Sequence, residues 1–287
     1  MLFARRALAI ASLYLILSLI FSASTQHRLR IAVLDFQGGD EKHSVEIAMR
    51  SALTSDERTS VVDPSQIEAA LAAGSTSSLN LTTDEARQIG ATIGCDAYVL
   101  GKVFVERSSP DGHPSFEVFV ALFLVDARTG QLVKFVSLSE NSDSVASVLS
   151  KTVITIKAQA KPLIDQMIAF REQQSELSST GSDNGVEDLP EENTPEAKGF
   201  TPPQFFRRYT PNYTALAAHA EVTATVDLNV LFRADGSIGE IAVTRWAGYG
   251  LDEAAIETVR SMKFQPATRN GKPISVRAPV RYNFRSK

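Results

Sequence analysis

The chain has very little of the chemistry on which disulfides and metal sites depend. Its 287 residues include one cysteine, Cys95, so it forms no intrachain disulfide and no cysteine metal cluster. It has four histidines, and they lie far apart: His27, His43, His113 and His219. His43 and Glu46 share one face of an expected helix, but one such pair does not make a zinc site. We therefore expect no bound metal and an inert core thiol at Cys95.

The motifs that mark common enzymes are also missing. The sequence contains neither a Gly-x-Gly-x-x-Gly or Gly-Lys-Ser/Thr phosphate loop nor a Gly-x-Ser-x-Gly nucleophile turn. Gly38 and Gly39 stand between an expected strand and helix, where we interpret them as a plain turn. Trp246 is the only tryptophan, and we interpret it as a packing cap over the helix that follows rather than a ligand platform. These absences predict a protein that is not an enzyme and has no cofactor or small-molecule substrate.

The charge is nearly balanced, with 29 Lys and Arg against 33 Asp and Glu, and it is unevenly spread. Residues 200–287 carry 12 basic and 7 acidic side chains, so this part is modestly basic on an otherwise acidic chain. It has no nucleic-acid motif and no array of arginines and aromatics, which argues against DNA or RNA as a partner. A modestly basic module suits an acidic peptide instead.

The first 25 residues have the pattern of an export or anchoring signal. Arg5 and Arg6 precede residues 7–23, which are apolar apart from serines and a tyrosine. Seventeen residues are at the lower limit for a membrane-spanning helix. A small-residue site for cleavage is present near Ser24 and Thr25. Two outcomes stay open: a retained inner-membrane anchor, or export with cleavage. Both place the rest of the chain in the periplasm.

Residues 29–172 are predicted to form an α/β domain with a mixed sheet and a sandwich-like arrangement. The pattern predicts strands at 29–36, 60–63, 96–107, 116–126 and 132–139. Helices are expected at 42–55, 65–73, 84–93 and 143–173. Pro162 should kink or divide the last helix.

Residues 173–202 are expected to be a disordered acidic linker. Ser, Gly, Asp and Glu dominate its middle part, which has little apolar surface to bury. The chain as a whole is therefore an α+β protein of two domains, with the second domain at residues 203–287.

The second domain is predicted to be a small ββαβ unit. Apolar and polar residues alternate over 223–232 and 239–245, and Asp235-Gly236 between these strands is a strong hairpin signal. A helix is expected at 251–262, because Leu251, Ala255, Val259 and Met262 share one face. A final strand at 274–284 contains Pro279, which cannot donate a ladder hydrogen bond, so this strand should lie at a sheet edge.

This unit resembles the C-terminal domain of the TonB energy-transducer family. The resemblance rests on Asp235-Gly236, Leu251-Asp252-Glu253-Ala254-Ala255, Phe264-Gln265-Pro266-Ala267 and Asn270-Gly271-Lys272-Pro273. It implies that an extended peptide of an outer-membrane transporter adds to the last strand by strand addition. The residues it implies as the partner-binding site are Ile274, Val276, Arg277, Ala278, Val280, Arg281, Tyr282 and Phe284.

The family also engages inner-membrane, proton-driven motor subunits through its N-terminal helix, typically with a histidine. Residues 7–23 contain no histidine. Residues 29–172 in turn resemble the periplasmic α/β domain of TolB, CsgG and LpoB, on Ile31-Ala32-Val33-Leu34-Asp35-Phe36 and Val125-Asp126-Ala127-Arg128-Thr129-Gly130 among other segments. That resemblance implies an assembly or interaction module.

Two functions follow from these features. The first is a periplasmic TonB-like transducer or adaptor that docks on outer-membrane transporters and supports energy-dependent transport. The second is a soluble periplasmic interaction or assembly protein without energy coupling.

Overall fold

The computed structural model describes residues 28–71, 78–109, 113–177, 186–190, 194 and 197–286. The predicted signal or anchor at 1–25 lies outside these residues, so its fate stays a prediction. Within the described ranges, no helix combines the length and apolar character that crossing a membrane requires.

A five-stranded mixed sheet forms the first half of the chain, in the order β2-β1-β3-β4-β5. Its strands are β1 (Leu29–Val33), β2 (Thr59–Val61), β3 (Ala97–Ser108), β4 (Ser115–Asp126) and β5 (Leu132–Ser142). Strand β1 runs parallel to β2 and β3, whereas β3, β4 and β5 are antiparallel neighbours. The predicted mixed sheet is confirmed.

Four helices accompany this sheet: α2 (Glu41–Thr54), α3 (Pro64–Leu71), α4 (Thr83–Ile93) and α5 (Val145–Leu177). The ends of α4 follow from its sequence. A reciprocal capping box joins Thr82 and Glu85 at its start, and Gly94 ends it with a φ of 70°. Pro162 lies inside α5 and does not divide it.

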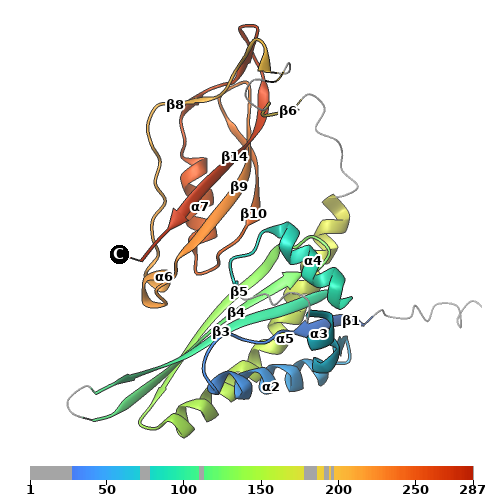
Figure 1. The fold of residues 1–287 in the computed structure, drawn as a ribbon, viewed down its shortest axis with the longest axis vertical. Coiled ribbons are helices and arrows are strands. Elements are labelled where there is room, and N and C mark those ends of the chain that lie inside the picture. The colour runs from blue at the N-terminus through green and yellow to red at the C-terminus, as the bar shows by residue number, and fades with distance from the viewer. Residues whose placement is uncertain are drawn as a thin grey trace, which may run out of the picture.

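Both faces of the first sheet are buried, and β4 shows this most clearly. Its residues alternate between two cores. Val118, Val120, Leu122 and Leu124 pack with α2 and α5. Phe119, Ala121, Phe123 and Val125 pack with α3, α4 and the C-terminal domain. Figure 1 shows α2 and α5 below this sheet and the C-terminal domain above it.

The C-terminal sheet has the order β10-β9-β14-β6. Its long strands are β9 (Ala224–Phe232), β10 (Ile238–Arg245) and β14 (Ser275–Phe284), and the short β6 (Val186–Asp188) completes it. Helix α7 (Leu251–Arg260) covers one face, and its predicted stripe is buried. A short helix, α6 (Ala215–His219), precedes β9. The predicted ββαβ unit is confirmed, and the chain is an α+β protein.

Five two-residue strands join the segment before this unit to the connection between α7 and β14. Strand β8 (Gln204–Phe205) pairs with β11 (Phe264–Gln265). Strand β12 (Thr268–Arg269) lies between β7 (Phe200–Thr201) and β13 (Lys272–Pro273). The segment before the ββαβ core is thus joined by backbone hydrogen bonds to the connection between α7 and β14.

The structure corrects the prediction of a wholly disordered linker. Helix α5 continues to Leu177, five residues past the predicted domain end at 172. Val186–Asp188, in the middle of the predicted linker, forms β6 and pairs in parallel with β14. The segment has few apolar residues, so its sequence did not predict a strand. The strand forms by pairing with β14, which lies about ninety residues further along the chain.

The two predicted domains share one hydrophobic core, and Trp246 lies in the middle of it. Its ring is 5.7 Å from that of Phe123 on β4, and its Nε1 donates to the carbonyl of Gly130 at 3.0 Å. A Cβ at Gly248 would lie 2.7 Å from ring atoms of Phe123 and Phe135, so only glycine allows this approach. We expected Trp246 to cover its own helix, and that expectation missed its partner in the first sheet.

Asn80 joins the same two parts by hydrogen bonds. Its Nδ2 donates to the carbonyls of Thr225 and Trp246 at 2.8 and 2.7 Å, and its Oδ1 accepts from the amide of Thr225 at 2.8 Å. The side chain thus pairs with β9 as a backbone segment would. Together with Trp246 it fixes the C-terminal domain on the first sheet.

We predict that Asn80→Ala destabilises this junction by roughly 2–4 kcal/mol, because three hydrogen bonds are lost and their partners stay half-buried. Trp246 is the only tryptophan, so its fluorescence during denaturant unfolding reports the junction directly. We expect its transition to move to lower denaturant concentration. Asn141→Ala, at an exposed position of β5, is the matched control and should leave the midpoint in place. An unchanged midpoint in Asn80→Ala would contradict this account of the junction.

Candidate functional site

β14 is the strand on which the docking prediction depends, and its two edges differ. The inner edge pairs with β9 in an unbroken antiparallel register from Val276 to Phe284. The outer edge pairs with β6 at Ser275–Arg277. Beyond Arg277, no strand in the described part of the chain pairs with it (Figure 1). The predicted edge strand is therefore covered over its first three residues and open from Pro279 onward.

One hydrogen bond shows which backbone groups of β14 face outward. The amide of Leu189 donates to the carbonyl of Arg277 at 3.1 Å, so the backbone groups of Arg277 point to the outer edge. Successive residues of a strand direct these groups to alternate sides. Pro279, Arg281 and Asn283 therefore face outward too. Pro279 has no N–H to offer there, which is the side of an edge strand where proline is tolerated.

The eight residues that the resemblance implied as the site divide into two groups. Six of them pack in the core of the C-terminal domain: Ile274, Val276, Ala278, Val280, Tyr282 and Phe284. The other two are paired across the sheet. Arg277 Nη2 lies 3.0 Å from Glu240 Oε2, and Arg281 Nε lies 2.6 Å from Asp227 Oδ1. What β14 offers a partner is therefore chiefly its outer backbone edge, with the exposed Arg281 beside it.

Asp227 holds the three long strands of this sheet together electrostatically. It lies on β9 and accepts from Arg281 on β14 and from Arg245 on β10, the latter at 3.2 Å. The Arg281 guanidinium, more than that of Arg245, holds the pKa of Asp227 below its usual range. The carboxylate stays ionised near neutral pH, and the outer edge keeps a basic side chain next to it.

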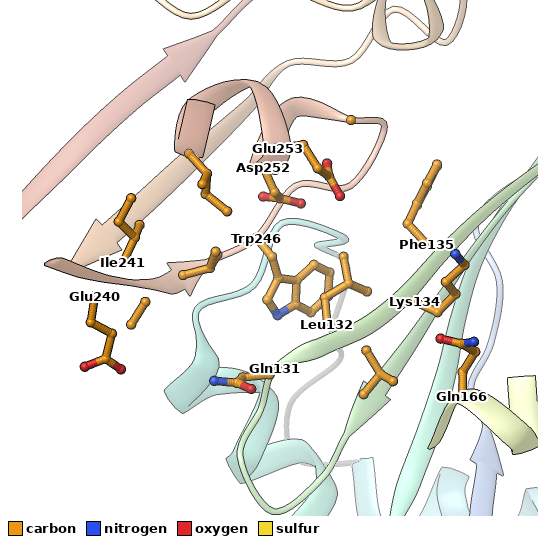
Figure 2. A pocket seen from close by; sticks show the side chains of 15 residues that line it. Gln131, Leu132, Lys134, Phe135, Gln166, Glu240, Ile241, Trp246, Asp252 and Glu253 are labelled. Atoms are coloured by element: carbon orange, nitrogen blue, oxygen red, sulfur yellow. The ribbon is translucent and has the colours of Figure 1, made fainter. Parts of the chain in front are cut away.

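A cavity of about 570 Å³ lies on the other side of the C-terminal sheet, at the junction with the first sheet. Residues of β5 and β10 line it, and each of these strands is the outermost of its sheet. Figure 2 shows Leu132 and Phe135 on one wall and Ile241 on the other, with Trp246 and Asp252 between them. Its lining combines apolar side chains with the charged side chains of Lys134, Glu240, Asp252 and Glu253.

Asp252 shapes the loop that closes this cavity. Its Oδ1 accepts from the amide of Ala247 at 2.9 Å, and its Oδ2 accepts from the amide of Gly248 at 2.7 Å. Burial raises the pKa of Asp252 to about 7, although both amide bonds act in the opposite direction. Asp252 lies in the first turn of α7, where a carboxylate suits the helix dipole, and it also holds the backbone of Ala247 and Gly248 in place next to Trp246.

The other candidates from the sequence have structural roles in the described chain. The carboxylate of Glu46 is buried and accepts from the amide of Phe36 at 2.8 Å, and His43 lies 3.6 Å from it. Lys42 pairs with Asp35 at 2.9 Å beside the Gly38 turn. Burial raises the pKa of the Cys95 thiol to about 11, so it is not a reactive thiolate. Across the described residues, no three His, Cys, Asp or Glu side chains gather as they would around a metal ion.

Three residues of this region escaped the sequence analysis: Asn80, Glu187 and Arg269. Asn80 stands in a segment that reads as a polar loop. Glu187 lies in the predicted linker and pairs with Arg269, whose Nε is 2.9 Å from its Oε2. Contacts between residues so distant in sequence leave no periodic pattern. The sequence did carry one signal of the junction between the two sheets, the unbroken apolar run of β4, because such a strand needs to be covered on both faces.

Comparison with known proteins supports the C-terminal resemblance. Residues 209–285 match the family model described as Gram-negative bacterial TonB protein C-terminal. The predicted resemblance of this part of the chain to the TonB C-terminal domain is confirmed there. Among curated proteins, none matches the sequence.

Solved structures resemble each half separately. The TonB C-terminal domain of Pseudomonas aeruginosa is 18% identical with a TM-score of 0.27, and the match covers 36% of this chain and 95% of that one. Escherichia coli LpoB is 14% identical with a TM-score of 0.30, over 39% and 57%. The lipoprotein GNA1162 of Neisseria meningitidis is 19% identical with a TM-score of 0.35, over 47% and 99%. LpoB is thus among the similar structures, as the sequence predicted, and at these scores no function is taken from any of them.

The raised pKa of Asp252 predicts a pH dependence of stability. An unfolded aspartate titrates near pH 4. The folded protein binds the Asp252 proton more tightly than the unfolded chain does. Protonated Asp252 therefore contributes fully to the free energy of unfolding below about pH 4, and this contribution declines as pH rises to about 7. The decline is at most about 1.4 kcal/mol per pH unit for one group.

We therefore expect Asp252→Asn to remove this decline, measured as the free energy of unfolding in urea at pH 4 to 7. Glu257→Gln, an exposed carboxylate on the same helix that does not affect the pKa of Asp252, is the control and should keep the wild-type slope. Equal slopes in wild type and Asp252→Asn would show that Asp252 ionises as an ordinary aspartate.

Proposed function

We propose that this chain is a periplasmic, TonB-like adaptor that docks on an outer-membrane transporter by strand addition. The observation that carries the proposal is the open outer edge of β14 from Pro279 to Phe284, within a domain that matches the TonB C-terminal model. The transporter would contribute an extended peptide, and the main chain of β14 would bind it.

The chemistry of the edge supports a peptide partner. Arg281 and Asn283 direct both their amide and their carbonyl outward, and Pro279 directs a carbonyl outward. Such groups bind any extended backbone, and the flanking side chains supply the preference. Arg281 is 64% exposed beside this edge, and residues 200–287 are net basic, so we expect acidic peptides to be favoured.

Energy coupling is a further part of the proposal and concerns the first 25 residues. A transducer needs an inner-membrane anchor next to the motor subunits, and only residues 7–23 have the composition for it. We include coupling to motor subunits in the proposal if residues 7–23 are retained as an inner-membrane anchor.

A second candidate is a periplasmic interaction or assembly protein without energy coupling. The shared core favours it, because Trp246 and Asn80 hold the docking domain on the first sheet instead of leaving it on a free tether. We further propose that the chain is not an enzyme. The groups that a Gly38 phosphate loop or a His43 metal site would use are engaged in structural contacts.

Strand addition predicts that a proline at an outward-facing position blocks binding. Arg281→Pro removes the outward amide and also the ion pair with Asp227, whereas Arg281→Ala removes only the ion pair. We expect Arg281→Pro to weaken binding about tenfold or more, and Arg281→Ala only about two- to threefold. The measurement is calorimetry with a synthetic peptide from the periplasm-facing segment of a transporter of the same organism. Equal affinities for the two variants would exclude strand addition at β14.

Coupling predicts that the N-terminal segment is retained. We expect mass spectrometry of fractionated cells to find a mature protein that starts at Met1 or Leu2 in the inner-membrane fraction. A mature start near Thr25 in the soluble periplasm would remove the anchor and leave the second candidate.

A further inference from the structure

The outer edge of β14 already holds a strand, and that strand belongs to the chain's own linker. Val186, Glu187 and Asp188 of β6 stand opposite Ser275, Val276 and Arg277 in parallel register. Leu189 adds a hydrogen bond from its amide to the carbonyl of Arg277. This is strand addition within one molecule, at the edge that the proposed function assigns to a partner.

An ion pair holds this strand in place. The Glu187 carboxylate lies 2.9 and 3.3 Å from Nε of Arg269 through its two oxygens. Arg269 lies on β12, which is paired on both sides, and its guanidinium is 5.5 Å from the ring centre of Phe200. A guanidinium fixed in this way selects a carboxylate by charge and by geometry.

β6 ends where the outer edge of β14 first lacks a backbone amide. The next outward residue of β14 is Pro279, which offers no amide, and on the linker side Pro190 follows Leu189 and cannot donate either. β6 therefore covers only the first rungs of the outer edge. A peptide that pairs in parallel along the whole outer edge of β14 has to displace β6 from Ser275–Arg277.

We propose that Val186–Asp188 is a resident ligand of the outer β14 edge, and that Arg269 selects partners carrying a carboxylate where β6 carries Glu187. The occupancy by β6 stands on the contacts above. The preference of an incoming partner rests on the proposed function. The partner is accordingly an extended acidic segment that competes with the linker.

Tethering makes this competition effective. β6 belongs to the same molecule, and a short tether of this kind gives an effective concentration in the millimolar range. If β6 occupies the edge about nine-tenths of the time, the apparent affinity of a competing peptide falls about tenfold. The linker thereby sets a minimum affinity that a partner needs in order to displace β6.

The test uses the full chain and a fluorescein-labelled synthetic peptide with the sequence of residues 184–190. Glu187→Gln should release β6 and remove the carboxylate that it presents to Arg269, so we expect the peptide to bind this variant at least tenfold more tightly than the wild type, by fluorescence anisotropy. Asp188→Asn makes the same change of charge at the exposed neighbouring position and should bind within about twofold of wild type. Equal affinity for wild type and Glu187→Gln would overturn the proposal.

Acid selection is tested with the same peptide carrying glutamine in place of its glutamate. We expect it to bind Glu187→Gln about five- to tenfold more weakly than the unaltered peptide. Equal binding of the two peptides would overturn the role of Arg269.

A second readout separates this proposal from the proposed function. Hydrogen exchange of the Leu189 amide in the unmodified chain needs no partner, and we expect clear protection that is lost in Glu187→Gln. Exchange at the rate of an unstructured peptide would overturn the occupancy by β6 and leave docking at the β14 edge intact. If Leu189 is protected and the linker peptide binds, but transporter peptides do not bind Glu187→Gln, then the proposed function fails and the resident strand stands.

Discussion

The burial of both faces of β4 is the constraint that places the C-terminal domain. Phe119, Ala121, Phe123 and Val125 form an apolar stripe that α3 and α4 do not cover alone. Each large side chain left in water would cost about 1.5–3 kcal/mol. Trp246 and Tyr249 complete the cover, and Gly248 allows their loop to approach the rings of Phe123 and Phe135. The C-terminal domain is consequently part of the same folded body as the first sheet.

The outer edge of β14 has no partner strand beyond Arg277 among the described residues. β10 and β9 both reach the junction: Arg245 on β10 donates to the carbonyl of Asn80, and the Asn80 side chain pairs with Thr225 on β9. β14 is the next strand after β9 in the sheet, and its outer edge is turned away from β9. Attachment on one side and an open edge on the other coexist in one small sheet. The edge is then divided between the resident β6 and the outward groups of Pro279, Arg281 and Asn283.

Local patterns predicted most of the fold, and long-range pairings supplied the rest. Alternation predicted β9, β10 and β14, and Pro279 predicted an edge strand. Those signals lie within a few residues of the structures they predict. The pairing of β6 with β14 depends on Arg269, and the position of the Trp246 ring depends on its contacts with Phe123 and Gly130. Neither pairing leaves a periodic trace, although the continuous apolar run of β4 showed that its second face needed a partner. For the site, the resemblance implied eight residues of β14, and the structure buries several of their side chains, such as Val276 and Phe284.

The most direct test of docking at β14 is amide hydrogen exchange, residue by residue, with and without a saturating transporter peptide. Strand addition at the outer edge predicts new protection at Arg281 and Asn283, and no change at Val280 and Tyr282, whose amides face β9. Protection that appears instead around the junction cavity, at residues such as Lys134 or Ile241, would place the partner elsewhere and contradict the account.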